Sequence, residues 1–189
     1  MPVELSEAID GHILLALART EIAEFLGIEA KIKPRRDAGW LRTPGACFVT
    51  LTKHGELRGC IGTLEAHRPL IEDVRGNAHA AAFRDPRFDP LRQEEFAEIS
   101  VGISLLSPPE PLHVETEGEA AAILRPHTDG VVLEYGWRRA TFLPQVWQQL
   151  PSPRQFLQQL KLKAGLAADF WAEDLRVFRY AVQKWEEGV

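Results

Sequence analysis

Apolar side chains recur every three to five positions in two long segments of the chain, the spacing of helices that bury one face. In the first segment, residues 5–26, Ser6 is placed to cap the helix and Gly27 to end it. In the second, Pro69 opens a helix that runs to about Phe83. We therefore expect two amphipathic helices in the first half of the chain.

Other segments alternate apolar and polar residues, as strands with one buried face do. Residues 45–64 contain two such runs around His54-Gly55, a pair that suits a tight two-residue hairpin turn. Residues 129–145 predict a second hairpin, which turns at Tyr135-Gly136. The remaining pattern predicts a strand over 99–105, a short helix over 117–125, a helix from Pro153 to Gly165 capped by Ser152, and a closing strand over 175–185.

The order of these elements points to an α+β fold. Helices are interspersed with hairpins, without the regular βαβ period of a parallel sheet. Residues 28–45 lack periodicity and are typical of a long loop, and the proline-rich run Ser107–Pro111 is the best seam between lobes. We expect one domain over residues 1–189, with an antiparallel sheet, flanking helices and a smaller lobe at about 107–150.

Charge composition bears on nucleic-acid binding. The chain has 22 basic and 27 acidic residues and a formal net charge of −5, whereas a protein that coats nucleic acid by charge alone needs a dominant basic face. Basic residues do gather within residues 31–58. A solvated face balanced by acids elsewhere is the simpler interpretation of this cluster, and a local basic patch is the alternative. RNA is therefore a partner that the net charge does not favour.

The cysteines and the first residues of the chain bear on the compartment in which the protein resides. Two cysteines, Cys47 and Cys60, follow a start that has neither a basic nor an apolar leader region, which predicts a reducing cytoplasm and no structural disulfide. No stretch approaches the roughly 20 apolar residues that a membrane span requires. We expect a soluble, cytoplasmic protein without a membrane partner.

The predicted strand ELRGCIG, residues 56–62, has an unusual composition. Its two glycines, Gly59 and Gly62, weaken a strand that only packs, so they indicate close approach by another backbone or by a ligand. Residues two apart in a strand share a face, so Arg58 and Cys60 are neighbours. We interpret these four residues as part of a cleft.

The pairing of this strand determines which residues lie opposite Cys60. If the His54-Gly55 turn is two residues long, Cys60 lies opposite Val49 and Arg58 lies opposite Leu51. A nearby cation favours the reactive thiolate and apolar surroundings disfavour it, so the reactivity of the thiol stays open. Cys60 is the candidate nucleophile, and a small buried hydrophobe is its alternative role.

A cysteine nucleophile also needs a base. His54 lies roughly 15–20 Å from Cys60 at about 3.3 Å per strand residue, which is too far, whereas His79 on the next helix could lie nearer. Cys47 has no cation two residues away and is expected to be a packing residue. The chain contains no Cys-x-x-Cys or His-x-x-x-His pair, so we predict no metal site.

Two further segments contribute candidate binding residues. Asn77 lies on the apolar stripe of the second helix, so it is either a buried amide with partners or a group presented to a pocket. Just beyond, Arg84, Asp85 and Arg87 crowd an irregular turn, where the aspartate can fix the orientation of an arginine. Loop stabilisation and anion binding are the two roles open to this turn.

Five stretches of the sequence, in order, resemble the AMMECR-one domain family, component A of the AmmeMemoRadiSam system. The stretches are LRGCIG (57–62), RPLIEDVRGNAHAAAFRDPRF (68–88), ISVGISLLSPPEPL (99–112), DGVVLEYGWRRATFLPQV (129–146) and LKLKAGL (160–166). The resemblance runs from about residue 10 to the last strand, and LRGCIG and FLPQVW are its most specific motifs. The bulky Trp137 departs from the pattern, because the hairpin is often smaller there.

The resemblance implies an α+β fold with a larger and a smaller lobe around an antiparallel sheet. It also implies association with a Memo-like protein of the dioxygenase fold and with a radical S-adenosylmethionine protein, and an RNA-related or regulatory role has been suspected for the family. The signature positions fall on residues 58–62, Asn77, Arg84, Asp85, Phe88, Asp129, Gly130 and the run Phe142–Val146, which contains Pro144 and Gln145. The resemblance identifies no substrate or cofactor.

Two hypotheses for function follow. The first is an enzyme or enzyme component that acts with these two partner proteins, with Cys60 as its catalytic residue. Its cleft would be lined by Arg58, Asn77, Arg84 and the 142–146 segment. The second is a regulatory module that binds protein or RNA without catalysis. The glycines that flank an arginine–cysteine pair favour the first.

Overall fold

The computed structural model describes residues 9–30 and 33–188 of the chain. These residues form two compact units. The first contains the chain up to Leu106 and from Gln183 onward, and the second is Ser107–Val182. The second unit extends beyond the 107–150 expected for a smaller lobe, because the helix and the strand that follow residue 150 pack and pair within it.

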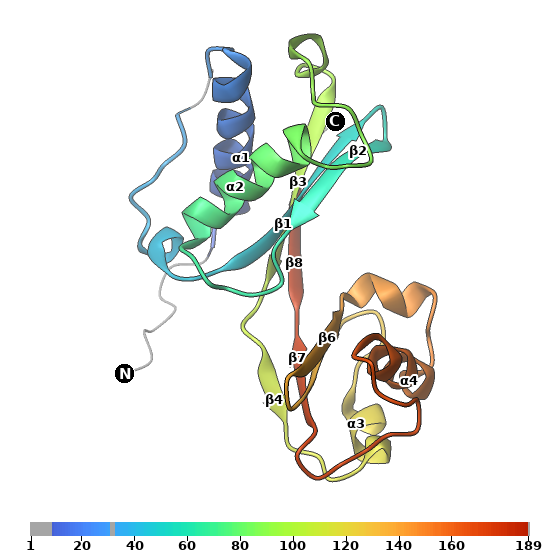
Figure 1. Ribbon diagram of the computed structural model, residues 1–189. Coiled ribbons are helices and arrows are strands. Elements are labelled where there is room, and N and C mark those ends of the chain that lie inside the picture. The colour runs from blue at the N-terminus through green and yellow to red at the C-terminus, as the bar shows by residue number, and fades with distance from the viewer. Residues whose placement is uncertain (1–8, 31–32, 189) are drawn as a thin grey trace. The chain divides into compact units, whose positions relative to one another are not determined.

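The first unit is a four-stranded antiparallel sheet with two helices on one face (Figure 1). The strand order is β2-β1-β3-β8, so β2 and β8 are its edges. The elements are α1 (Gly11–Leu26), η1 (Gly39–Arg42), β1 (Ala46–Lys53), β2 (Glu56–Gly62), α2 (Leu70–Phe83), η2 (Gln93–Glu95), β3 (Ile99–Leu106) and β8 (Val182–Glu186).

The second unit has its own four-stranded antiparallel sheet, in the order β4-β7-β5-β6. Its elements are β4 (Glu110–Leu112), α3 (Glu117–Ile123), β5 (Gly130–Tyr135), β6 (Arg138–Phe142), η3 (Pro144–Gln148), α4 (Pro153–Lys163) and β7 (Arg176–Tyr180). Two antiparallel sheets with flanking helices confirm the predicted α+β class.

Helix α1 begins later than its apolar pattern. The Asp10 side chain accepts a hydrogen bond of 2.9 Å from the His12 N–H, which caps the helix. Ser6, the cap expected from sequence, lies outside the described residues. At the other end, Gly27 has a φ of 70° and ends the helix, as predicted.

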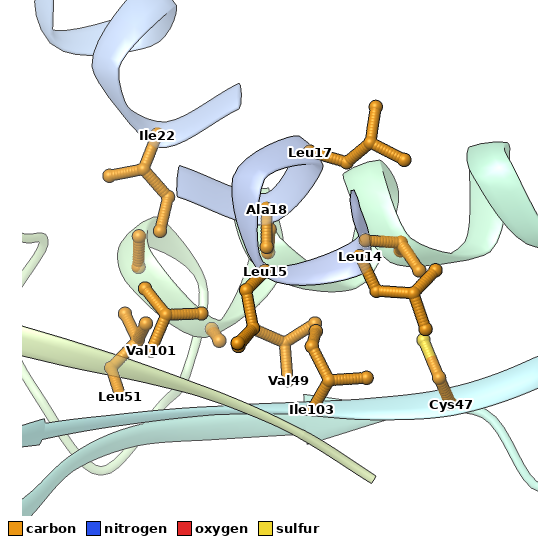
Figure 2. Packing of buried hydrophobic residues seen from close by; sticks show 14 of the residues in the cluster. Leu14, Leu15, Leu17, Ala18, Ile22, Cys47, Val49, Leu51, Val101 and Ile103 are labelled. Atoms are coloured by element: carbon orange, nitrogen blue, oxygen red, sulfur yellow. The ribbon is translucent and has the colours of Figure 1, made fainter. Parts of the chain in front are cut away.

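The core of the first unit forms between α1, α2 and alternate residues of β1 and β3. Figure 2 shows Leu14, Leu15 and Ala18 of α1 above Val49 and Ile103 of the sheet. The intervening residues of β1, such as Phe48, Thr50 and Thr52, are only half-buried because they lie on the other face. The alternation predicted from sequence therefore decides which sheet face the helices cover.

The two hairpins differ in how well their turns were predicted. The first turns at His54-Gly55 with φ values of 52° and 81°, as expected. The second turns at Gly136-Trp137, one residue later than predicted, because Tyr135 still pairs with Arg138. Gly136 takes the left-handed conformation at the first turn position, where glycine is favoured.

The C-terminal segment 175–185 is two strands rather than one. β7 belongs to the sheet of the second unit and β8 to the sheet of the first, with Ala181 between them. Continuous strand-like composition cannot show this change of sheet, because the composition of a strand does not indicate which sheet it joins.

The core of the second unit centres on an aromatic stack. Trp147 and Phe156 lie 3.7 Å apart with their rings nearly parallel, and the Trp147 indole donates a 2.7 Å hydrogen bond to the Asp129 carbonyl. Phe156, Leu157 and Leu160 of α4 point inward, as predicted. Ser152 stands at the start of α4, although its side chain makes no capping hydrogen bond. Among the described helices, none has the length and apolarity to cross a membrane.

Candidate functional site

A β-bulge at Arg58 sets the geometry of β2. Before the bulge Leu57 lies opposite Thr52, and after it Gly59 lies opposite Leu51 and Cys60 opposite Thr50. The predicted pairs of Cys60 with Val49 and of Arg58 with Leu51 are therefore wrong. The physical reason is that a bulge inserts one extra residue into a strand and shifts every later pair by one.

The two glycines of β2 make room for the protein itself. A Cβ on Gly59 would fall on the carbonyl oxygen of Ala81 in α2, and a Cβ on Gly62 would fall on the Phe48 ring. Of the two approaches left open by the sequence, another backbone explains Gly59, and a neighbouring side chain explains Gly62. Access for a ligand is therefore not needed to explain either glycine.

Arg58 is held by an acidic partner. Its guanidinium donates to the Glu95 carboxylate at 3.1 and 3.0 Å and to the Asp89 carbonyl at 3.0 Å. These bonds lower the pKa of Glu95 to about 2, chiefly through the Arg58 hydrogen bond. In the described part of the chain, the hydrogen bonds of Arg58 thus go to the 89–95 loop rather than to Cys60.

The Cys60 thiol is half-exposed on the sheet face that the helices leave uncovered. Its Sγ lies 3.2 Å from the Thr50 hydroxyl. Its backbone N–H donates to the Asp85 carboxylate at 2.8 Å, and its carbonyl accepts from the Arg87 guanidinium at 3.3 Å. We call these two residues the Asp85–Arg87 clamp. The clamp fixes the backbone of Cys60 from the outer edge of the sheet.

The clamp is itself an ion pair, which confirms that the aspartate orients an arginine. Arg87 donates to the two Asp85 oxygens at 2.9 and 2.6 Å. The hydrogen bond from Arg87 is the main reason that the pKa of Asp85 is well below its usual value. The pKa of Arg87 is raised, chiefly by its hydrogen bond to Asp85. Arg87, not Arg58, is the cation that bonds to Cys60, at its backbone carbonyl.

Arg84 has a different position from its neighbours. It is exposed and directly follows α2, where its N–H bonds to the Ala80 carbonyl. Within residues 9–30 and 33–188, its side chain makes no hydrogen bond or ion pair. Arg84 thus lies near the clamp in sequence without belonging to it.

The row of residues that contains Cys60 crosses the whole sheet. Cys60 lies opposite Thr50, Thr50 lies opposite Gly102, and the Glu186 Cγ is 3.4 Å from the position of a Gly102 Cβ. Directly opposite residues of an antiparallel pair share a face. A thiol, a hydroxyl, a gap at glycine and a carboxylate therefore follow one another over about 14 Å, at about 4.8 Å per strand. We call this the Cys60 row.

Asn77 takes the buried role of its two alternatives. It is 4% exposed, and its amide donates to the Cys47 carbonyl at 2.9 Å and to the Asp73 carboxylate at 3.0 Å. Arg68 approaches its oxygen at 3.4 Å. These partners satisfy the amide within the protein.

Sequence reasoning missed Asp73, the centre of this buried network. Its carboxylate is fully buried and accepts from the Cys47 N–H at 2.8 Å, the Thr63 hydroxyl at 2.7 Å and Arg68 at 2.8 Å. The four-residue spacing to Asn77 on one helix face was the available signal. Burial raises the pKa of the Cys47 thiol, which packs in the core as expected.

Pro144 and Gln145 lie in the second unit. Pro144 is half-buried at the start of η3, and Gln145 beside it is exposed. Cys60, Asn77 and the clamp all lie in the first unit. The candidate site is accordingly built from first-unit residues alone.

The histidines considered as bases have other contacts. His54 lies 3.2 Å from the Glu98 carboxylate, and the His79 ring packs on Phe25 and Phe83. In the part of the chain that the structure describes, no group of three His, Cys, Asp or Glu side chains could hold a metal ion.

Comparisons with known proteins identify the family to which this chain is similar. A model of the AMMECR1 family matches residues 15–185, nearly the whole chain. The chain belongs to the AMMECR1 family. This confirms the resemblance carried by LRGCIG and FLPQVW.

Similar proteins occur in archaea and bacteria. A protein of Methanothermobacter thermautotrophicus is 39% identical over 181 residues, which cover 94% of each chain. A protein of Thermotoga maritima is 40% identical over 147 residues, or 77% of this chain and 79% of that one. The crystal structure of the uncharacterized protein PH0010 from Pyrococcus horikoshii is 34% identical with a TM-score of 0.73, and covers 94% of this chain and 91% of that one. The fold is thus shared with a solved structure.

The first unit of this AMMECR1-family chain presents chemistry that the sequence only partly predicted. Cys60 was predicted, whereas Thr50 and Glu186 were not, and Arg87 was noted without a role beside the thiol. The correct partner of Cys60 depends on the bulge, and Glu186 reaches the row only because β8 returns to the first sheet. A thiol held beside a hydroxyl and a guanidinium can act as a nucleophile or bind an electrophilic group.

Proposed function

We propose that this AMMECR1-family chain is an enzyme or enzyme component whose working site is the Cys60 row. The observation that carries the proposal is the position of the Cys60 thiol. The thiol is half-exposed and lies 3.2 Å from the Thr50 hydroxyl, and the Asp85–Arg87 clamp holds both the N–H and the carbonyl of the Cys60 backbone. A packing cysteine needs no such support, whereas a reacting group benefits from being held in place.

The groups around Cys60 can support it as a nucleophile. The Arg87 guanidinium bonds to the Cys60 carbonyl at 3.3 Å, and the Thr50 hydroxyl, 3.2 Å from the sulfur, can donate a hydrogen bond to it. Glu186, at the other end of the row, offers a carboxylate to the substrate. In this proposal Cys60 is the nucleophile, Thr50 and Arg87 support it, and Glu186 helps to bind.

The partners in this proposal are a Memo-like protein and a radical S-adenosylmethionine protein. Radical or oxygen chemistry would come from these partners, because the proposed site offers a nucleophile and polar groups. The AMMECR1-family chain would supply the thiol to which a substrate is attached or presented. Arg84, Pro144 and Gln145 stay candidate contacts for substrate or partner, whereas the buried Asn77 supports the fold.

Alkylation kinetics test whether Cys60 is activated. We expect iodoacetamide at pH 7 to modify Cys60 of the native protein faster than a short peptide that contains cysteine. Arg87→Gln should slow the reaction about fivefold, the factor that corresponds to about 1 kcal/mol, the Coulomb energy of two charges about 4 Å apart in water. Peptide mapping by mass spectrometry assigns each modified residue.

Two controls make this result specific. Arg84→Gln removes an equal charge from the same segment outside the clamp and should leave the rate unchanged. Cys47, which is buried, should be modified only after unfolding in urea. A native Cys60 no faster than the peptide, or equal rates in both arginine variants, would reject the enzymatic proposal.

A second candidate, a regulatory module that binds protein or RNA without catalysis, is favoured by the surroundings of the other signature residues. Arg58 is engaged by Glu95, and the spaces beside Gly59 and Gly62 are filled by α2 and Phe48. Residues that serve the fold in this way do not require chemistry. An unreactive Cys60 in the experiment above would favour this candidate.

A further inference from the structure

Charge is unevenly distributed in the second unit. Residues 135–168 contain five basic residues and no acidic residue, in a chain whose formal net charge is −5. This stretch includes β6, η3 and α4. An acid-free stretch of this length on an acidic protein leaves a local surface that attracts negative charge.

Ion pairing separates the basic residues of the second unit into two groups. Five of them bond to a carboxylate within the unit: Arg125 to Asp129, Arg139 and Arg176 to Glu134, Lys161 to Glu117, and Arg179 to Glu110. Among the described residues, Arg138, Arg154 and Lys163 form no ion pair. The unpaired cations all lie in the acid-free stretch.

One unpaired cation lies beside an exposed tryptophan, and a second bonds to the same hairpin. Trp137, at the tip of the β5–β6 hairpin, is 89% exposed, and the Arg138 guanidinium lies 5.2 Å from the centre of its ring. Arg138 also donates to the Gly165 carbonyl, and Lys163 donates to the Thr141 carbonyl at 2.9 Å. These bonds tie the end of α4 to the hairpin that bears the indole.

An exposed aliphatic residue completes the surface. Leu162 is 48% exposed, and its carbonyl accepts from the Gly165 N–H at 2.9 Å. We call Trp137, Arg138, Leu162 and Lys163 the Trp137 patch. It combines two large apolar side chains with two cations that have no carboxylate partner.

We infer that the Trp137 patch binds an acidic polypeptide segment that carries an apolar side chain. Tryptophan and arginine are the residues that most often dominate protein interfaces, and an arginine without a carboxylate partner can take one from the ligand. An indole exposed at a fixed hairpin tip offers a large contact area with little loss of side-chain freedom on binding. The patch is thus complementary to acidic residues beside an aromatic or aliphatic one.

Nucleic acid and lipid fit the patch less well. A nucleic-acid surface needs phosphate contacts along a basic tract, whereas the patch contains only two cations and the chain as a whole is acidic. An anionic membrane surface likewise calls for a larger basic cluster. The inference rests on the part of the proposed function that gives the chain a protein partner, and not on the chemistry of Cys60.

A peptide selection tests the inference without a known partner. The purified full chain is used to select from a display library of random 16-residue peptides. We expect enriched peptides that combine several Asp or Glu residues with an aromatic or aliphatic residue. The best peptide is then labelled with fluorescein, and its Kd is measured by anisotropy. Trp137→Ala and Arg138→Glu should each weaken binding at least ~10-fold, the loss typical of central interface residues.

Arg154→Glu is the matched control. It makes the same charge change at an unpaired cation at the start of α4, about 14 Å along the helix from Lys163. This variant should change the Kd less than threefold. Thermal unfolding followed by circular dichroism checks that each variant is folded, which the exposure of Trp137 leads us to expect.

Several outcomes would overturn the inference. They are a selection without enriched peptides, enriched peptides without acidic residues, and equal losses for Arg138→Glu and Arg154→Glu. Binding of a 20-nucleotide oligouridylate or of phosphatidylserine vesicles that depends on Trp137 would assign the patch to nucleic acid or membrane instead. None of these measurements involves Cys60, so failure here is distinct from failure of the alkylation test.

Discussion

The two cysteines of the first unit have the same backbone arrangement and opposite surroundings. In each case the N–H donates to an aspartate at 2.8 Å, Asp73 for Cys47 and Asp85 for Cys60. In each case the carbonyl accepts from a side chain, Asn77 for Cys47 and Arg87 for Cys60. At both cysteines, an aspartate in or just after α2 accepts the N–H hydrogen bond that a neighbouring strand would otherwise accept.

The difference lies in what each arrangement does to the thiol. Asp73 and Asn77 are buried and enclose Cys47 in the core, whereas the Asp85–Arg87 clamp lies at the sheet edge and leaves Cys60 half-exposed. Similar side-chain bonds to a cysteine backbone are therefore compatible with an enclosed thiol at one site and an accessible thiol at the other. The following substitutions test the difference between the two sites, in order of decreasing expected effect.

Asp73→Ala should have the largest effect, a loss of about 3–5 kcal/mol in the free energy of unfolding. Removal of the buried carboxylate takes the acceptor from the Cys47 N–H, the Thr63 hydroxyl and the Asn77 amide, and it breaks the ion pair with Arg68. Urea denaturation followed by fluorescence measures the loss. Glu72→Ala, an exposed acid in the same helical turn, should cost less than about 1 kcal/mol. Equal losses in the two variants would contradict a structural role for the network.

Asp85→Asn should have a smaller effect at neutral pH, about 1–2 kcal/mol, because it weakens one hydrogen-bonded ion pair at the sheet edge. The folded-state pKa of Asp85 is lowered below its ordinary 3.8. The ionised carboxylate therefore stabilises the fold above that value, and the stabilisation is lost as the pH falls below it.

The pH dependence provides the measurement for Asp85. The difference in unfolding free energy between the wild type and Asp85→Asn should shrink as the pH is lowered from 7 to 3. Asp89→Asn, in the same loop, is the control and should show no such trend. A difference between the wild type and Asp85→Asn that grows toward pH 3 would contradict the assigned ionisation.

Thr50→Val should have the smallest effect. It removes the hydroxyl 3.2 Å from the Cys60 sulfur and keeps a similar shape. One hydrogen bond contributes about 1 kcal/mol, so alkylation of Cys60 should slow no more than about fivefold, with little change in stability. Thr52→Val, on the same face of β1, should leave the rate unchanged. An equal decrease in both variants would show that the hydroxyl has no specific effect on Cys60.

The sequence predicted those parts of the fold that depend on local pattern. Helix α2, the alternation of β3 and the turn at His54-Gly55 follow from residue spacing and from backbone preferences. The bulge at Arg58 could not be predicted, because one inserted residue does not change the composition of a strand. That single residue decides which side chain lies beside Cys60.

Of the candidate site, the sequence predicted the Cys60 thiol but not the residues that surround it. Asp85 was expected to orient an arginine of its turn, but the bonds of Asp85 and Arg87 to the Cys60 backbone join segments that are 25 and 27 residues apart. The long-range position of Glu186 depends on a strand that changes sheets. Local patterns contain no information on such contacts.

The clamp also bears on strand pairing at the edge of the first sheet. Strand β2 is an edge of its sheet, and an exposed edge can extend into a neighbouring molecule through its free backbone groups. At Cys60 both groups are already occupied by Asp85 and Arg87, so a second chain finds neither donor nor acceptor there. The same two side chains that hold the thiol in place keep the sheet from growing past it.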